Sequence, residues 1–256
     1  MSRGLGDVYK RQDENGAVNV TNPYASAGTV ITSRLPYTGD IDGDNKEETI
    51  STSTDAQGLT VLNVEASGKT AEVSTAIKEL GSIRLFDLDG DGVREIYIDG
   101  KDANADTITC VAFYSPDESQ PLHLALFDSQ SYAQGSIKEF ADSKLILDTE
   151  TNILGTYKVK NVYALADKSF SKASGDIVFD NNMTYVTTSK SITLSNGSLL
   201  ATGTKLRFTS TDGSSVINFV TDGGFTGSIP IASSGSGWTI SGQPDTSYFT
   251  SLPYKN

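Results

Sequence analysis

The chain has 256 residues, of which 37% are hydrophobic and 20% charged, a composition typical of a folded protein with one large domain or two smaller ones. Its net charge of −12 argues against a nucleic-acid partner, because phosphate binding needs a basic surface. No apolar run approaches the roughly 18 residues that a transmembrane segment needs.

Residues 1–12, with the sequence MSRGLGDVYKRQ, form the first segment. They lack the apolar stretch of a secretory signal and resemble translated sequencing-adapter read-through. We therefore expect a non-native leader, with the native N-terminus missing and a signal or lipoprotein leader lost with it. Residues 1–12 carry a charge of +2, whereas residues 13–180 carry −15.

An acidic nonapeptide occurs twice within residues 13–180, displaced by 47 residues. Residues 40–48 read DIDGDNKEE and residues 87–95 read DLDGDGVRE. Between them, short strand-like runs with turn signals lie at residues 49–54, 59–65, 70–77 and 82–86. Four strands in about 45 residues match the size of one β-propeller blade.

Each nonapeptide places carboxylates at positions 1, 3, 5 and 9, which repel one another unless a cation screens them. Calcium suits such a loop because it accepts six to eight oxygen ligands in flexible geometry, and a backbone carbonyl at position 7 can add one. The sequence predicts two calcium ions, with ligands from Asp40, Asp42, Asp44, Lys46 and Glu48 in one loop and from Asp87, Asp89, Asp91, Val93 and Glu95 in the other. A pair of solvated acidic turns without metal is the alternative.

An EF-hand is excluded, because position 12 is Ser51 or Ile98 instead of the required Glu and the second loop leads into an alternating, strand-like run. A ninth-position acid that leads into a strand resembles the calcium loops of FG-GAP and VCBS-type repeats. The resemblance covers residues 29–100 well and extends weakly to about 170. It implies blades of an integrin-like β-propeller with calcium loops between strands. The calcium is expected to be structural.

Further strands are expected at residues 107–114, 122–127, 144–147 and 157–165, and the best helix candidate is residues 136–144, at most two turns. About three blades cannot close a propeller. Either the missing N-terminal part supplies the other blades, or residues 101–180 complete a smaller assembly. The first case would leave an unpaired sheet edge that favours association.

From about residue 181 the sequence predicts short strands separated by glycine turns. These strands are expected at residues 185–188, 191–194, 205–210, 216–221 and 227–231. Residues 184–231 resemble the Src-homology-3-like barrels of bacterial cell-surface proteins, although Gly227-Ser228-Ile229 replaces the usual Gly-Tyr-Val unit. We therefore expect a boundary within residues 174–182 and a small barrel over 181–256. Four aromatic residues could form a ligand surface or fill the barrel core: Phe225, Trp238, Tyr248 and Tyr254.

Catalytic motifs are absent from the sequence. The single histidine, His123, is expected to be structural or exposed, and Cys110 is the only cysteine, so neither a zinc site nor a disulfide can be assembled. No Gly-x-Ser-x-Gly, Walker-type or dinucleotide-binding glycine motif occurs. The acids that a glycosidase would need are mostly committed to the two loops.

The sequence therefore predicts an all-β protein of partial propeller-like blades followed by a small barrel, extracellular or at the cell surface and not an enzyme. Its repeats and barrel would bind a cell-surface protein, peptidoglycan or another glycan. Two alternatives remain open: an accessory C-terminal part of a larger secreted hydrolase, or a purely structural stalk. Sequence repeats of this kind accompany several functions, so fold analogy does not separate them.

Overall fold

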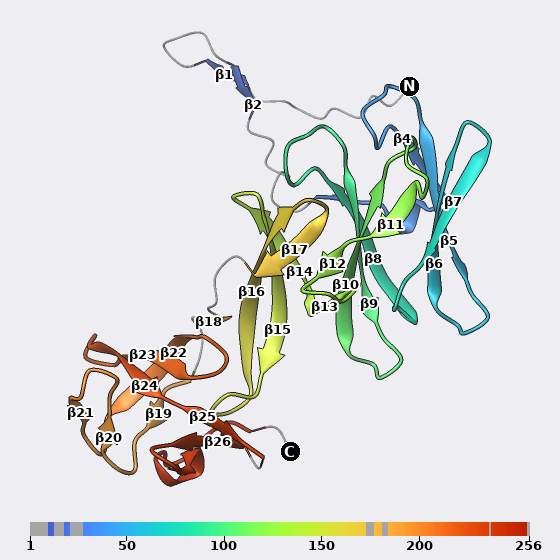
Figure 1. The fold of residues 1–256 in the computed structure, drawn as a ribbon. Helices are drawn as coiled ribbons and strands as arrows, with labels where there is room; N and C mark the ends of the chain where they lie inside the picture. The colour runs from blue at the N-terminus through green and yellow to red at the C-terminus, as the bar shows by residue number, and fades with distance from the viewer. Residues whose placement is uncertain are drawn as a thin grey trace.

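The computed structural model describes residues 28–172, 177–180, 184–235 and 237–254, together with the backbone of two paired strands, β1 (Lys10–Gln12) and β2 (Val18–Val20). The described chain is all-β (Figure 1), and its only helical turns are the 3₁₀ segments η1 (Thr32–Arg34) and η2 (Asp245–Ser247). None of its helices could span a membrane. The predicted leader at residues 1–12 lies mostly outside the described residues.

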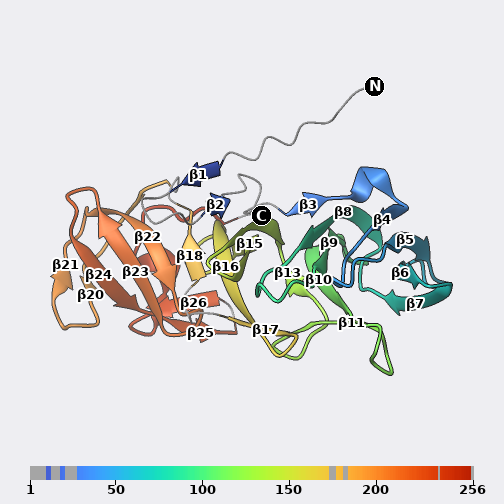
Figure 2. The same ribbon diagram turned by 90° about the horizontal axis from the view of Figure 1, so that it is seen from above.

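Three sheets dominate the fold, and they follow one another along the molecule (Figure 2). The first sheet has the order β4-β5-β6-β7, with bounds Tyr37–Gly39, Glu48–Thr54, Thr60–Ala66 and Lys69–Ser74. The central sheet has the order β11-β10-β9-β8-β3, with β13 also paired to β10; in chain order its strands are β3 (Thr29–Val30), β8 (Glu79–Phe86), β9 (Glu95–Lys101), β10 (Thr107–Tyr114), β11 (Leu122–Leu124) and β13 (Ala133–Gln134).

The third, long sheet has ten strands and runs β12-β17-β16-β18-β22-β23-β24. In addition, β15 pairs with β16, β14 pairs with β15, and β19 pairs with β22. Its bounds are β12 (Leu126–Phe127), β14 (Ser136–Ala141), β15 (Lys144–Thr151), β16 (Tyr157–Ala166), β17 (Ser169–Lys172), β18 (Ile177–Phe179), β19 (Val186–Thr187), β22 (Lys205–Thr211), β23 (Val216–Thr221) and β24 (Thr226–Pro230). Two small sheets complete the described chain: β20 (Ile192–Thr193) with β21 (Leu199–Leu200), and β25 (Ala232–Ser234), β26 (Gly237–Ile240) and β27 (Gln243–Pro244).

The central sheet is buried on both faces. On β9, Ile96 and Ile98 point into a first core shared with the first sheet, whereas Tyr97 points into a second core shared with the long sheet. Because successive side chains of a strand alternate between faces, a strand covered on both sides reads as a continuous apolar run. The sequence Ile-Tyr-Ile of β9 meets this requirement. Cys110, on β10, is fully buried in the first core.

The outer face of the first sheet is polar. Ser51, Asn63 and Glu72 are cross-strand partners in one row of this face, and Asn63 donates a side-chain hydrogen bond to Ser53 at 3.1 Å. The opposite face of the same strands carries Ile50 and other residues of the first core. A hydrated row of this kind needs no further apolar layer over it.

Residues 136–144, the best helix candidate in the sequence, contain no helix. Residues 136–141 form β14, which pairs with β15 through a turn where Asp142 and Ser143 both have positive φ, as a two-residue hairpin requires. A register shift between Ile137 and Glu139 adds one residue to β14, so the buried side chains Ile137 and Phe140 are three positions apart. This bulge produces an apolar spacing that resembles a helical one.

A third core lies at the C-terminal end and draws on both sides of the boundary expected within residues 174–182. Tyr157, Val159 and Phe179 pack there with Phe208 and Phe249. The strand β18 pairs with β16 on one side and β22 on the other, so one sheet continues across this region. Part of the expected boundary lies outside the described residues, and the division into domains stays a prediction. No sheet of the described chain closes into a barrel.

Gly100 on β9 gives a test of this packing. A Cβ atom there would lie 2.4 Å from Cγ2 of Ile77 and 2.5 Å from the carbonyl oxygen of Glu79. We expect Gly100→Ala to lower the free energy of unfolding in urea by about 1–3 kcal/mol, because the backbone atom cannot move aside alone. The control is Gly223→Ala, whose Cβ would meet its nearest atom at 3.9 Å. Equal stabilities of the two variants would contradict this packing.

Candidate metal centres

The two acidic loops occupy equivalent places in successive sheets. Loop 1 (residues 40–48) joins β4 to β5 in the first sheet, and loop 2 (residues 87–95) joins β8 to β9 in the central sheet. The last acid of each loop, Glu48 or Glu95, is the first residue of the following strand and is only 2% exposed. The sequence repeat of 47 residues therefore corresponds to a structural repeat.

Backbone N–H groups of each loop donate to its own carboxylates in the same pattern. In loop 2, Asp87 accepts from Gly90 N at 2.7 Å and Gly92 N at 3.0 Å, and Glu95 Oε2 accepts from Leu88 N at 2.9 Å. The corresponding distances in loop 1 are 2.8, 3.0 and 2.9 Å. Two separate stretches of sequence thus hold position-1 and position-9 acids in the same orientation.

Left-handed backbone at positions 4 and 6 allows each loop to curl. Gly90 and Gly92 have φ of 77° and 93°, and their counterparts Gly43 and Asn45 have φ of 80° and 63°. Glycine adopts this region freely, and asparagine tolerates it better than most residues. Both loops therefore make a sharp turn at position 6.

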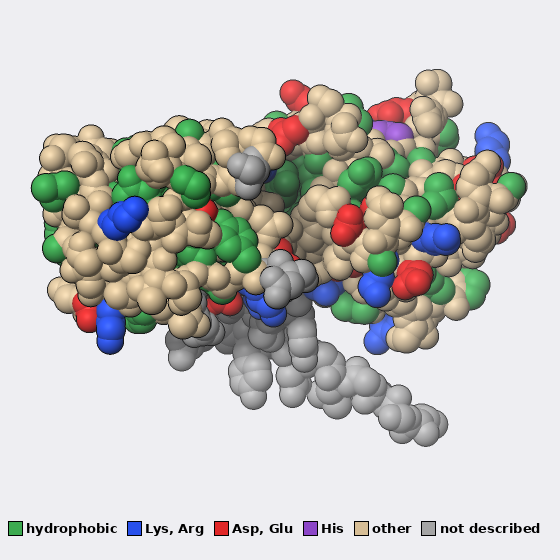
Figure 3. Space-filling model, turned by 90° about the horizontal axis from the view of Figure 1, so that it is seen from below, with side chains coloured by type: hydrophobic (Ala, Val, Ile, Leu, Met, Phe, Trp, Pro, Cys, Tyr) green, Lys and Arg blue, Asp and Glu red, His purple; other side chains and the backbone are tan. Residues whose placement is uncertain are grey.

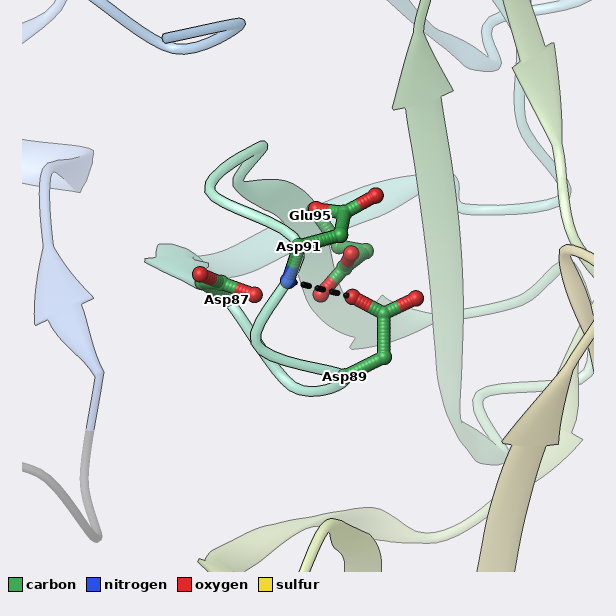
Figure 4. Close-up of side chains that lie close together, drawn as sticks. All are labelled: Asp87, Asp89, Asp91 and Glu95. Carbon is green, nitrogen blue, oxygen red and sulfur yellow. Dashed lines mark hydrogen bonds between the residues drawn. The ribbon is translucent and has the colours of Figure 1, made fainter.

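Loop 2 brings its four acids together. Carboxylate oxygens of Asp87, Asp89, Asp91 and Glu95 lie within 4.8 Å of one another, around the curled backbone (Figure 4). Burial raises the pKa of Glu95 to about 7, and the charges of Asp87 and Asp89 add to this effect, although Leu88 N–H and the Tyr97 hydroxyl act against it. Burial also raises the pKa of Asp89. A cation among these oxygens would relieve the mutual repulsion.

Loop 1 gathers three acids instead of four. Oxygens of Asp40, Asp42 and Glu48 lie within 4.8 Å of one another, whereas the Asp44 carboxylate pairs with the Lys46 ammonium at 2.6 Å. The hydrogen bond from Lys46 holds the pKa of Asp44 below its usual range. Glu48, and not the exposed Glu47, is the buried acid that closes the loop.

The remaining predicted ligands are the carbonyls of Lys46 and Val93. Their backbone N–H groups donate to Asp44 Oδ1 at 2.7 Å and to Asp91 Oδ1 at 2.8 Å, so position 7 is tied to position 5 in both loops. The metal-binding role of these carbonyls stays a prediction.

Sequence reasoning missed Tyr97, whose hydroxyl donates to Glu95 Oε2 at 3.1 Å from within the second core. The available signal was its position two residues after Glu95, because side chains at that spacing lie on the same face of a strand. With Leu88 N–H and the Tyr97 hydroxyl on Oε2, this oxygen is fixed in place. The acid is therefore held rigidly beside the three aspartates.

Sequence reasoning also missed the contact between the loops. Arg94 N–H of loop 2 donates to the Ile41 carbonyl of loop 1 at 2.8 Å. A Cβ atom added to Gly43 would lie 3.0 Å from the carbonyl oxygen of Gly92. The two clusters therefore share a backbone interface, through which a change in one loop can affect the other.

His123 lies outside these clusters, as expected for a structural or exposed residue. It is on β11, where its ring stacks on Phe113 and its Nδ1 is 3.8 Å from a Glu118 carboxylate oxygen. Comparison with known protein families, characterised proteins and solved structures finds no match to this chain. The site is therefore interpreted from its own chemistry.

The raised pKa of Glu95 predicts a pH dependence for the calcium-free protein. Between about pH 4.5 and 7 the folded state keeps a proton that the unfolded state releases, so this contribution to stability is present below pH 4.5 and lost as the pH rises through 7. The loss is up to about 3 kcal/mol, which urea unfolding at several pH values measures. Glu95→Gln should remove this slope, and Glu72→Gln, at an exposed position, should keep it. An unchanged slope in Glu95→Gln would contradict the buried acid.

The contact between the loops predicts a difference between two matched glycine variants. Gly43 and Gly90 occupy position 4 with φ of 80° and 77°, so alanine causes similar backbone strain at both. Only at Gly43 would the new Cβ press on the other loop, since Gly90 has nothing within 4 Å. We expect Gly43→Ala to lower the free energy of unfolding by about 1 kcal/mol more than Gly90→Ala. Equal losses in urea denaturation would argue against the contact.

Proposed function

We propose that this chain is a non-catalytic calcium-binding protein whose ions stabilise the starts of strands β5 and β9. The convergence of four carboxylates in loop 2 carries this proposal. Within the described chain none of these four acids forms an ion pair with a lysine or arginine side chain, so the site lacks a protein cation of its own. Oxygen-rich loops of this kind favour calcium over softer metals.

Structural calcium is the role that the position of the loops supports. Each loop precedes a strand that enters the first core, and loop 2 also contacts the second core through Tyr97. An ion would therefore restrain the loop and the packed strand that follows it. Metal binding to the folded state alone adds its free energy to folding.

The finer architecture that we propose is a set of propeller-like blades. In the first sheet and in the central sheet, an acidic loop joins two neighbouring strands. The two sheets pack face to face through the first core. The C-terminal strands around the third core would form a small barrel-like unit. The two parts would together bind a ligand at a cell surface or outside the cell, where calcium is plentiful enough to fill weak sites.

The decisive experiment compares thermal unfolding in excess calcium with unfolding in EGTA. At free calcium of about 100 times Kd, one site adds about 2.7 kcal/mol, which corresponds to roughly 5–10 °C in Tm for a chain of this size. Magnesium at the same concentration should give a smaller shift, because it demands a stricter octahedral geometry. Superimposable melts in calcium and EGTA would refute the proposal.

Calorimetric titration assigns the ions to the loops. The wild type should bind two calcium ions, and the double variant Asp87→Asn with Asp89→Asn should bind one. Asp102→Asn is the matched control, because Asp102 also accepts backbone N–H bonds in a turn, from Asn104 and Asp106, but belongs to neither cluster. Loss of a calcium ion in the control would contradict the assignment.

A further inference from the structure

A cleft of about 610 Å³ lies between two segments that are distant in sequence. One wall is the end of β15 and the turn after it, with Glu150, Asn152 and Thr156, and the other is the C-terminal segment with Trp238, Asp245 and Tyr254. Figure 1 shows β25 and β26 beside the end of β15. The cleft lies outside residues 184–231, and its volume is within the roughly 300–1,000 Å³ of small-molecule sites.

Two aromatic side chains of the cleft are held in fixed positions. Tyr254 is 39% exposed, and its hydroxyl donates to the carboxylate of Asp245, a residue that is only 4% exposed. Asp245 also accepts a hydrogen bond from Thr246 N at 2.8 Å. Trp238 is half-buried, with part of its ring packed against the third core. Rings that are already ordered lose little entropy when a ligand stacks on them.

The polar groups of the cleft are mostly uncharged donors and acceptors. The Asn152 side-chain oxygen accepts from the Thr156 hydroxyl at 2.7 Å, which orients its amide, and Thr239 adds another hydroxyl. Among the described residues that line the cleft, only Glu150 and Asp245 are charged, and both are acids. This charge disfavours phosphate, sulfate or carboxylate ligands.

The surface around the C-terminal strands is also poor in charge. Figure 3 shows mainly uncharged side chains over this part of the visible face, with red and blue side chains more frequent over the N-terminal sheets. Residues 181–256 carry a charge of only +1, against −15 for residues 13–180. A ligand of this region therefore has to be recognised by hydrogen bonds and stacking.

We propose that this cleft binds a neutral saccharide. A sugar ring has an apolar C–H face that can cover an indole or phenol ring, and hydroxyls around its edge that pair with amide, hydroxyl and carboxylate groups. Trp238 and Tyr254 supply the rings, and Asn152, Thr239 and Glu150 supply the polar groups. This inference rests on the ligand-binding part of the proposed function and gives it a site and a ligand class.

The test uses the fluorescence of Trp238, which is the only tryptophan of the chain. The full chain in excess calcium is titrated with chitotetraose, cellotetraose, xylotetraose and mannotetraose, and with a sulfated heparin tetrasaccharide. We expect a saturable spectral shift with at least one neutral tetrasaccharide and none with the sulfated one. No shift with any neutral sugar up to 10 mM, or a stronger response to the sulfated one, would overturn the proposal.

Variants separate the cleft from other aromatic surfaces, with calorimetry as the readout. Trp238→Ala should weaken binding of the active tetrasaccharide at least tenfold, and Tyr254→Phe several-fold, because the ring loses its bond to Asp245. Asn152→Ala tests the opposite wall if Trp238→Ala fails to fold. Phe225→Ala is the control, since Phe225 is 51% exposed but does not line the cleft. An equal loss in Phe225→Ala would overturn the assignment.

Calcium and sugar binding are measured on the same protein, so the two proposals fail separately. Sugar binding with superimposable melts in calcium and EGTA would remove the calcium function and leave the cleft. A calcium-dependent Tm without any response to sugar would refute the saccharide site and leave the calcium function.

Discussion

The strand β9 connects the acidic site of loop 2 to the packing of the whole N-terminal half. Its first residue, Glu95, is a buried acid, and its next three residues alternate between the first core and the second core. A strand covered on both faces cannot shift by one residue without exchanging its two sets of side chains. The position of Glu95 is therefore set by two cores at once, and the Tyr97 hydroxyl adds a direct link.

The two loops share a backbone design but differ in how their charge is balanced. In loop 1 the Lys46 ammonium pairs with Asp44, so one of four acids already has a cation beside it. In loop 2 position 7 is Val93, and all four acids remain in one group. Loop 2 therefore has the greater need for an external cation. The same nonapeptide pattern thus gives two acidic clusters that differ in how much of their charge is balanced within the protein.

Much of the strand pattern could be predicted from the sequence, because alternation and turn residues act locally. The strand expected at residues 107–114 coincides with β10, and both acidic loops precede strands as expected. Residues 136–144 were a helix candidate because a bulge in β14 gives its buried residues a spacing that resembles a helical one. The bulge depends on how β14 pairs with β15, and the sequence of one segment alone does not reveal this pairing.

The detailed geometry of the two acidic loops could be predicted from the sequence less well than their location. Spacing alone indicated that acids gather in each loop, since a curled loop of nine residues has few other arrangements. The turn of Asp44 towards Lys46 depends on a side-chain rotamer, and the contact between Arg94 and Ile41 depends on how two sheets stack. Such features arise from tertiary packing and leave no periodic signal in the chain.

The burial of Cys110 has a practical consequence. It is the only thiol, it lies in the middle of the central sheet with no exposed surface, and burial raises its pKa to about 11. A thiol reagent can modify it only after β10 separates from its neighbours, since the thiolate is the reactive form. The rate of labelling would therefore report the opening of the innermost layer, without any engineered probe and independently of the tryptophan at the other end of the molecule.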